Sequence, residues 1–366
     1  MRNDVKDVNV HAAGSGKRAT IRDVATRAGV SHQTVSRVIN LNPNVADHTR
    51  ERVLAAIRDL SYVPSPMARG LLSSRTHALG VVADDISDGF FARMVAGAEA
   101  EARRRGYYLM IGSVEPDDDE RGYLRLMLER RVEGLILARP SVPLAPDDLL
   151  PARNAGVPLV GVGVGALPGF PVVDIDNHQG GYDATRHLLE HGHDRIATIV
   201  GPREWPSAAA RLEGYRRALR EAGVAEDPAL VEYVSDWGLA SGQAAAARLL
   251  ERNVPFTALF AQSDLIALGA IRQLRDARRR VPDDVSVIGY DDLPVADFVE
   301  PALTTVHQPM QEVGALAAGL LLDQLTGVAT LEAGARLLPA VLVARHSVAP
   351  PPDRRRGNTG LIGTRS

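Results

Sequence analysis

The stretch "ATIRDVATRAGVSHQTVSRVIN", residues 19–40, contains two short amphipathic helical patterns separated by a turn. Thr20 is a good N-cap, and Asp23 stands three residues later, which completes a capping-box arrangement before an apolar face. Gly29 is expected to end the first helix, because glycine adopts the positive φ of a helix C-terminus at little cost. Ser31 then begins a second helix as its N-cap. The stretch therefore predicts a helix-turn-helix.

The second helix is expected to expose a polar side, and the N-terminal residues of such a helix reach base edges in the major groove. Glutamine pairs bidentately with adenine and arginine with guanine, while hydroxyl groups and a helix N-terminus suit phosphate oxygens. The alternative is a merely solvated helix surface. We assign to DNA binding the polar residues Thr20, Ser31, His32, Gln33, Thr34, Ser36 and Arg37.

The charge distribution favours DNA binding by this end of the chain. Residues 17–75 contain ten Lys or Arg against four acidic residues, a net charge of +6. Residues 1–16 balance, so the chain's total of -3 leaves -9 for everything after residue 75. A basic head on an acidic body indicates that only the head meets a polyanion, although a solvated basic surface would have the same charge.

A third helix is expected from Asp47 to about Leu60, with Val53 and Ile57 on its core face. The segment "YVPSPMARGLLSSR", residues 62–75, follows. Its prolines prevent a simple continuation of the helix. By itself this segment predicts a linker.

From His77 onward, apolar strand-like runs alternate with helical stretches, which predicts parallel sheets covered by helices on both faces. Ligands bind beyond the carboxyl ends of the strands in such sheets. Aromatic rings, an arginine and carboxylates follow these strands and suit a sugar or a similar polyol. These strand-end residues include Phe90, Trp205, Ser207, Arg211, Trp237, Ser263, Asp264 and Asp291.

The quoted motifs, "TRERVLAAIRDLSYVPSPMARGL" and the body together resemble the lactose-repressor (LacI/GalR) family of bacterial transcription regulators, from about residue 19 to about 350. The resemblance implies that the linker is a hinge helix that orders on operator DNA. In that case Ala68, Arg69 and Leu71 contact DNA, and the leucine enters the minor groove. Ala46 departs from the family pattern, which usually has a capping serine there.

The same resemblance implies a periplasmic-binding-protein-like body of two subdomains that close on an effector. It assigns the effector contacts to Phe90, Ser207, Arg211, Trp237, Ser263 and Asp291. Asp264 also matches the family pattern, but a structural role is an alternative. Ser263 and Gly163 replace more polar family residues, so the effector's identity does not transfer from a relative. The effector is expected to be a sugar, and either sign of its coupling to DNA binding remains open.

The expected organisation is an all-α helix-turn-helix domain joined to an α/β body of two doubly wound parallel-sheet subdomains. The expected segments are a disordered tail (1–18), the DNA-binding domain (19–62), the hinge (63–76), the effector-binding and dimerisation domain (77–350) and a second disordered tail (351–366). Within the body, one subdomain is expected at about 77–176 plus 308–337 and the other at about 177–307 plus 338–350. The expected partners are a near-palindromic operator, a small effector and a second copy of the chain.

Other classes of protein have weaker support. The chain has no cysteine, no secretory signal and no uncharged run long enough to span a bilayer, so a cytoplasmic, nucleoid-associated protein is expected. A solute-binding protein would share the body but has no use for residues 20–60. No nucleophile–base set indicates an enzyme, and we expect no cofactor. The histidines at 187, 191 and 193 fit packing better than a metal site, and "GVGVGALPG" matches no nucleotide loop.

Overall fold

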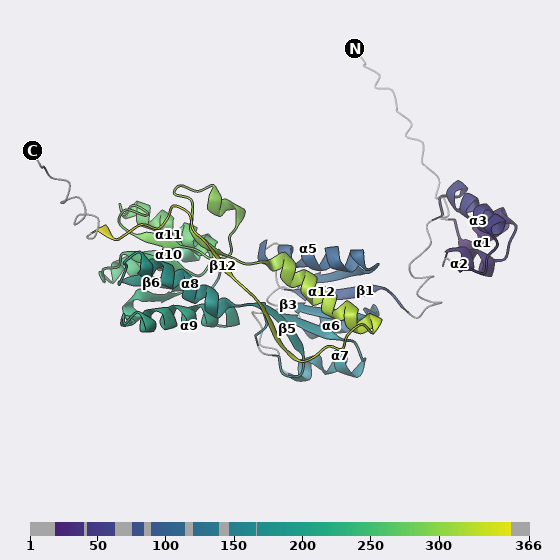
Figure 1. The fold of residues 1–366 in the computed structure, drawn as a ribbon, viewed down its shortest axis with the longest axis horizontal. Coiled ribbons are helices and arrows are strands. Elements are labelled where there is room, and N and C mark those ends of the chain that lie inside the picture. Colours follow the sequence, from purple (N-terminus) through teal and green to yellow (C-terminus); the bar gives the residue numbers. More distant parts are fainter. Residues whose placement is uncertain are drawn as a thin grey trace, which may run out of the picture. The chain divides into compact units, whose positions relative to one another are not determined.

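The computed structural model of the chain describes residues 19–39, 42–62, 75–83, 89–113, 120–138, 146–165 and 167–352. By its contacts the chain divides into two compact units, Met1–Thr76 and His77–Ser366. We call the first the head and the second the body. Figure 1 shows a small all-helical head and a body of mixed helices and strands.

The head contains three described helices, α1 (Ile21–Ala28), α2 (His32–Ile39) and α3 (Asp47–Asp59). Thr20 and Asp23 form the expected capping box at the start of α1, and Gly29 closes its C-terminus at φ 63°. Ser31 accepts a hydrogen bond from the amide of Thr34 at 3.1 Å and so caps α2. Ala46 gives α3 no side-chain cap. The predicted helix-turn-helix is therefore confirmed, together with the caps predicted for α1 and α2.

A small apolar core holds the three helices together. Val24, Val35 and Val53 each have 0% of their surface exposed and supply one side chain from each helix. Arg52 on α3 donates to the carbonyl oxygens of Ala28 and Gly29, which end α1. The turn between α1 and α2 is thus fixed by apolar packing and by a guanidinium group that binds carbonyl groups left free at the end of α1.

The first lobe of the body, the N-lobe, is a six-stranded sheet of order β11-β5-β4-β3-β1-β2 with every neighbouring pair parallel. Helices cover both of its faces, as expected for a sheet that is buried on both sides. Its strands are β1 (Ala78–Ala83), β2 (Tyr108–Ser113), β3 (Gly134–Ala138), β4 (Leu159–Val162), β5 (Pro171–Ile175) and β11 (Gly334–Leu338). Its helices are α5 (Gly89–Arg104), α6 (Glu120–Glu129), α7 (Leu150–Asn154) and α12 (Met310–Thr326).

The second lobe, the C-lobe, is a parallel four-stranded sheet of order β7-β6-β8-β9. Its strands are β6 (Ile196–Val200), β7 (Val231–Tyr233), β8 (Ala258–Ala261) and β9 (Ser286–Ile288). Its helices are α8 (Asn177–Glu190), α9 (Pro206–Glu221), α10 (Leu239–Glu251) and α11 (Asp264–Asp276). Short 3-10 helices lie at Pro228–Leu230 and Pro294–Asp297 in this lobe and at Pro146–Leu149 in the N-lobe. The two sheets confirm the predicted fold class.

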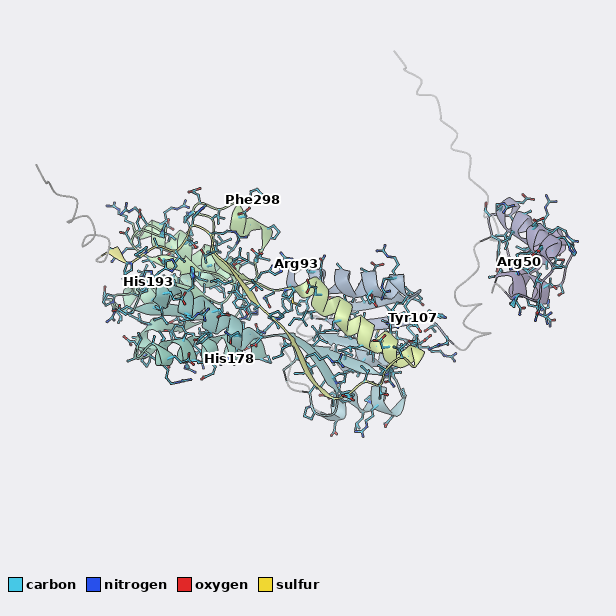
Figure 2. All side chains as sticks on the ribbon, viewed as in Figure 1. Arg50, Arg93, Tyr107, His178, His193 and Phe298 are labelled. Carbon is cyan, nitrogen blue, oxygen red and sulfur yellow. The ribbon has the colours of Figure 1, made fainter. Side chains whose placement is uncertain are left out.

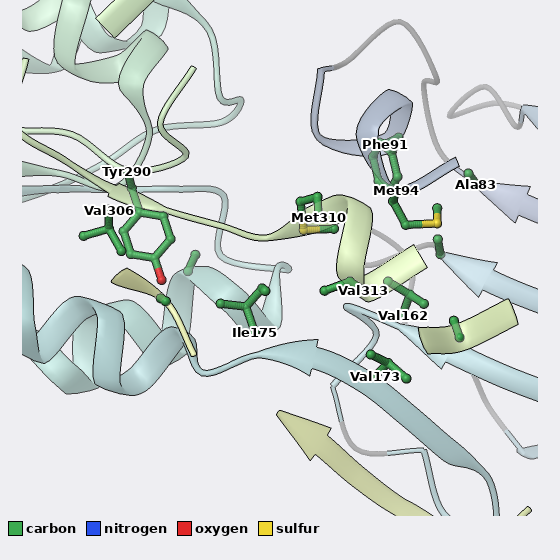
Figure 3. Packing of buried hydrophobic residues seen from close by; sticks show 14 of the residues in the cluster. Ala83, Phe91, Met94, Val162, Val173, Ile175, Tyr290, Val306, Met310 and Val313 are labelled. Carbon is green, nitrogen blue, oxygen red and sulfur yellow. The ribbon is translucent and has the colours of Figure 1, made fainter. Parts of the chain in front are cut away.

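The chain crosses between the lobes three times, and two crossings form an antiparallel ribbon of β10 (Thr305–His307) and β12 (Val341–Val343). One buried apolar cluster continues across these crossings. In Figure 3, Phe91, Met310 and Val313 represent the N-lobe, whereas Tyr290 and Val306 lie beyond the crossing. The lobes are therefore connected by both the backbone and the core.

Glycines allow the helices of the C-lobe to pack closely. A Cβ atom on Gly181 of α8 would lie 2.2 Å from the carbonyl oxygen of Arg211 on α9. A Cβ atom on Gly214 of α9 would lie 2.1 Å from the carbonyl oxygen of His178 on α8. Because no side chain fits in either place, the two backbones meet and the position of Arg211 is fixed relative to α8.

Candidate functional site

The start and outer side of α2 hold most of the residues that the sequence assigned to DNA, whereas Thr20 caps α1. His32, Gln33 and Arg37 are exposed, whereas Thr34 and Ser36 are half-buried. The Ser31 and Thr34 hydroxyl groups lie 3.0 Å apart and bond to one another at the helix start. The structure thus places an imidazole and an amide at the N-terminus of a short helix and a guanidinium group in its last turn.

Several arginines of the head serve its own fold. Arg27 pairs with Asp59 at 2.9 Å, and Arg52 binds the end of α1. Arg50, labelled in Figure 2, donates to the carbonyl oxygen of Asn42 at 2.9 Å. The net charge of +6 therefore overstates the number of cations available to a ligand. The predicted hinge contacts Ala68, Arg69 and Leu71 lie outside the described residues.

The body contains a pocket of about 740 Å³, part of it open to solvent, that brings together all six predicted effector residues. They come from both lobes: Phe90 from the N-lobe and the other five from the C-lobe. The full lining is Phe90, Arg93, Gly163, Asp174, Asn177, Trp205, Ser207, Arg211, Trp237, Ser263, Leu265, Asp291, Leu293, Gln308 and Met310.

Arg211 is the most constrained polar group of this pocket, with 3% of its surface exposed. Its Nε donates to Asn177 at 2.8 Å and its Nη1 to the carbonyl oxygen of Gln262 at 2.6 Å. The guanidinium carbon lies 3.7 Å from the ring centroid of Tyr290. These contacts hold the side chain in one orientation.

Two consecutive aspartates form a turn at the end of β9. Asp291 (φ 116°) and Asp292 (φ 54°) have a backbone conformation that is uncommon for residues other than glycine. The Asp291 carboxylate lies 4.0 Å from Arg211 Nη1 and accepts a hydrogen bond from Gln308 at 2.6 Å. The turn thus aims one carboxylate into the pocket beside the arginine.

Asp264 has a structural role beneath this turn. It is buried, accepts a hydrogen bond from the Thr305 hydroxyl group at 2.5 Å and another from the amide of Leu293 at 2.7 Å. Burial first, and then the nearby Asp291 charge, raise the pKa of Asp264 to about 7. Asp264 is not among the residues that line the pocket, so the structural alternative fits it.

Aromatic rings form an apolar wall. The Trp205 and Trp237 rings meet edge to face with centroids 5.4 Å apart, and Phe90 lies against Phe91 at 5.1 Å. A Cβ atom on Gly201 would lie 2.1 Å from the Trp237 ring, so glycine is needed there to seat the indole. Both tryptophans of the chain therefore line the pocket, and the tryptophan fluorescence of the chain comes from this site.

A contact between the lobes lies at the edge of the pocket. Arg93 of α5, labelled in Figure 2, reaches the carbonyl oxygen of Asp292 with both terminal nitrogens at 3.5 Å. The Asp292 carboxylate bonds to His307 at 3.0 Å and to Arg345 at 2.7 Å. Asp292 thus joins the N-lobe helix, a crossing strand and the segment after β12.

The sequence did not identify Asp174, Asn177, Gln308 and Arg93 as pocket residues. Asp174 is the clearest of these, because it is a carboxylate within an otherwise buried strand, β5. Its Oδ1 accepts from the amide of Ile175 at 2.7 Å. Burial raises the pKa of Asp174 to about 6. A carboxylate inside an apolar, strand-like run was visible in the sequence and could have indicated this residue.

Two buried polar atoms on the pocket wall lack a partner in the described part of the chain: Trp237 Nε1, a donor, and Gln308 Oε1, an acceptor. Buried polar atoms are nearly always hydrogen-bonded. A ligand that both accepts and donates hydrogen bonds would satisfy them. A polyol has both capacities at each hydroxyl group.

The chain is similar to known proteins in both the head and the body. Residues 20–65 match the family model "Bacterial regulatory proteins, lacI family", and residues 185–348 match a periplasmic binding protein-like domain. The transcriptional repressor CytR of Escherichia coli (strain K12) is 36% identical over 334 residues, which cover 90% of this chain and 96% of CytR.

Two solved structures are also similar. A complex of the regulator CelR with cellobiose is 39% identical with a TM-score of 0.67, and the match covers 90% of this chain and all of that one. The lac repressor dimer bound to operator and the anti-inducer ONPF is 31% identical with a TM-score of 0.83, covering 91% of this chain and all of that one. In the part of the chain that is described, no helix is long and apolar enough to cross a membrane.

Proposed function

Because the chain belongs to the LacI family and is a DNA-binding transcriptional regulator rather than an enzyme, we propose that it is a sugar-controlled repressor that acts as a homodimer. The observation that carries this proposal is the pairing of a helix-turn-helix head with a pocket that collects all six predicted effector residues. The regulator acts where DNA is, in the cytoplasm and on the nucleoid.

The head reads a near-palindromic operator, with one half-site for each copy. Gln33 and Arg37 on the outer side of α2 read base edges, and Ser31 and Thr34 with the helix N-terminus bind phosphate. One head presents too few side chains for a specific site, so two copies are needed. Ala68, Arg69 and Leu71 add minor-groove contacts when the hinge orders.

The effector is a small sugar. The tryptophan wall suits the apolar face of a sugar ring, and Arg211, Asp291 and Asp174 suit its hydroxyl groups. Trp237 Nε1 and Gln308 Oε1 gain partners when such a ligand binds. The CelR–cellobiose complex supports the same class of ligand by similarity.

Binding is coupled to DNA through closure of the lobes. A ligand held between Phe90 and the C-lobe residues favours the closed arrangement, in which Arg93 contacts Asp292. Closure repositions the N-lobe against its dimer mate, separates the two hinges and disfavours their DNA-bound form. The ligand therefore releases the operator.

Dimerisation uses an apolar surface of the C-lobe. Phe298 is 86% exposed and lies on the C-lobe in Figure 2, and Val295, three residues earlier on the same 3-10 turn, is 39% exposed. Residues three apart on a 3-10 turn share one side, so the two side chains form a small apolar surface that a second copy of the chain can cover. Phe298→Ala is expected to shift the dimer to monomer in light scattering, whereas an unchanged dimer would place the interface elsewhere.

DNA reading is tested by footprinting the chain's own upstream region. We expect a protected near-palindrome, and the absence of any protected palindrome in the genomic neighbourhood would contradict the repressor. Gln33→Ala should then relax the preference at one base pair in each half-site, by about 1–3 kcal/mol. Equal weakening on every DNA sequence would mean that Gln33 contacts phosphate instead.

A further inference from the structure

A second hollow in the C-lobe, of about 760 Å³ and part of it open to solvent, is lined by Ile271, Arg275, Arg278, Arg279, Arg280, Val281, Glu300 and Pro301. It shares no lining residue with the effector pocket. Four arginines and one glutamate give it a formal charge of +3. This charge is unusual for a body whose residues after position 75 total -9.

Two arginines of this stretch are neutralised by ion pairs, Arg272 beside the hollow and Arg280 in its lining, whereas the other three arginines of the lining are not. Arg272 pairs with Asp276 at 3.1 Å, and Arg280 pairs with Asp284 at 3.2 Å. Within the described residues, the side chains of Arg275, Arg278 and Arg279 have no hydrogen-bond or ion-pair partner. All three are exposed.

The backbone beneath these guanidinium groups is fixed. The amide of Arg278 donates to the carbonyl oxygen of Arg275 at 2.9 Å, and the amide of Arg279 donates to that of Leu274 at 2.8 Å. Arg278 adopts φ 59°, at a position that glycine commonly occupies after a helix. Three guanidinium groups without ion-pair partners among the described residues therefore extend from a helix C-terminus whose backbone is hydrogen-bonded.

The end of α11 does not account for this charge. A helix C-terminus is equivalent to about half a negative charge, which compensates part of one arginine. Glu300 lines the hollow, has no ion-pair partner within the described residues, and offsets the charge of one more arginine. An uncompensated cationic group in a concave surface is a binding site for an anion.

From these observations we propose that this hollow binds a small molecule that carries two or more phosphate groups. Guanidinium groups bind phosphate oxygens in bidentate pairs, and several arginines around one hollow require more than one phosphate. The ligand enters a site separate from the effector pocket, so the chain takes two kinds of small molecule.

The test uses the full chain and inorganic triphosphate as the probe, measured by calorimetry at two salt concentrations. We expect binding that weakens with salt, and an affinity at least tenfold lower in the Arg278→Ala/Arg279→Ala double variant. Both side chains are exposed, so the fold is expected to remain. The control is Arg217→Ala/Arg220→Ala on α9, which removes the same charge from another exposed surface.

Four results would overturn the proposal. The first is no binding of triphosphate, and the second is equal affinity in the Arg278→Ala/Arg279→Ala variant and in the α9 control. The third is loss of binding in Arg37→Ala of the head instead, which would mean that triphosphate occupies the DNA-binding surface. Stronger binding of a hexaglutamate peptide through the same arginines would assign the hollow to an acidic protein segment.

Discussion

The outer side of α2 and the effector pocket both offer polar side chains to a ligand, but they are built in opposite ways. On α2, Gln33 and Arg37 are exposed on one short helix. In the pocket, Arg211 is buried and two of its nitrogens already bind Asn177 and Gln262. In the head, the residues that bind the ligand therefore contribute little to folding, whereas in the pocket the same residue both binds the ligand and stabilises the fold.

The strongest test of this contrast is Arg211→Ala. The change leaves the half-buried Asp291 carboxylate without its cation and removes one hydrogen-bond partner each from Asn177 and Gln262, so we expect the body to lose about 3–5 kcal/mol of stability. The effector response should vanish while the folded protein still binds DNA. Thermal unfolding followed by tryptophan fluorescence measures the loss.

The matched control for Arg211 is Arg217→Ala on the same helix. Arg217 pairs with Glu221 on an exposed surface, and exposed ion pairs contribute little. We expect no measurable change in the melting temperature. Equal losses in the two variants would show that Arg211 is not the anchor that its contacts indicate.

A second test moves the aromatic wall without removing it. In Gly201→Ala the new methyl group collides with Trp237, and overpacking of this kind costs about 1–3 kcal/mol. The tryptophan emission should shift because both indoles lie at the pocket. Gly319→Ala on α12 is the control, since a Cβ atom there meets nothing closer than 3.8 Å.

The third test uses the charge of Asp174. Its folded pKa of about 6 lies above the unfolded value of about 3.9, so the folded state holds the proton more tightly. The favourable contribution of Asp174 to the free energy of unfolding is complete below about pH 4 and is lost as the pH rises through 6. Asp174→Asn should therefore be more stable than the parent at pH 7.5, by about 1–2 kcal/mol after allowance for solvent screening.

The difference between Asp174→Asn and the parent should shrink toward pH 4.5. Urea unfolding at both pH values measures it. A constant difference would mean that Asp174 does not change its protonation on folding, and a less stable variant at pH 7.5 would mean that the nearby Arg211 charge outweighs burial.

The smallest expected effect belongs to the head. Ala46 leaves the start of α3 without a side-chain cap, so Ala46→Ser should stabilise the head by about 0.5–1 kcal/mol. Circular dichroism of the helical signal during heating follows this change. Binding to DNA should not change, and a loss of operator affinity would show that position 46 lies in the DNA interface.

The two regions also differ in what the sequence could predict. The caps of α1 and α2 depend on contacts within three residues, so Thr20, Asp23 and Gly29 could be identified from local rules alone. Arg211 and Asp291 are eighty positions apart and meet only because β6 and β9 belong to one sheet. The strand-end rule listed both residues and the resemblance to a family assigned them to the effector, whereas their geometry required the fold.

Residues that depend on the crossing between lobes were the hardest to predict. Gln308 and Arg93 join the pocket from a crossing segment and from the N-lobe, and neither follows a C-lobe strand as the strand-end rule expects. The role of Asp292 depends on His307 and Arg345, which are distant in the sequence. No local pattern contains such a contact.

The central claim is that the pocket controls the binding of α2 to DNA, and one titration tests it. The full chain is mixed with a labelled duplex that carries the footprinted operator. A panel of sugars including cellobiose and ribose is then added, and the tryptophan fluorescence of the protein and the anisotropy of the labelled operator are recorded together. We predict that a sugar that changes the fluorescence also releases the operator, and that it does neither in Arg211→Ala. A sugar that changes the fluorescence while operator affinity stays constant would contradict the coupling, and a panel without any response would contradict the sugar.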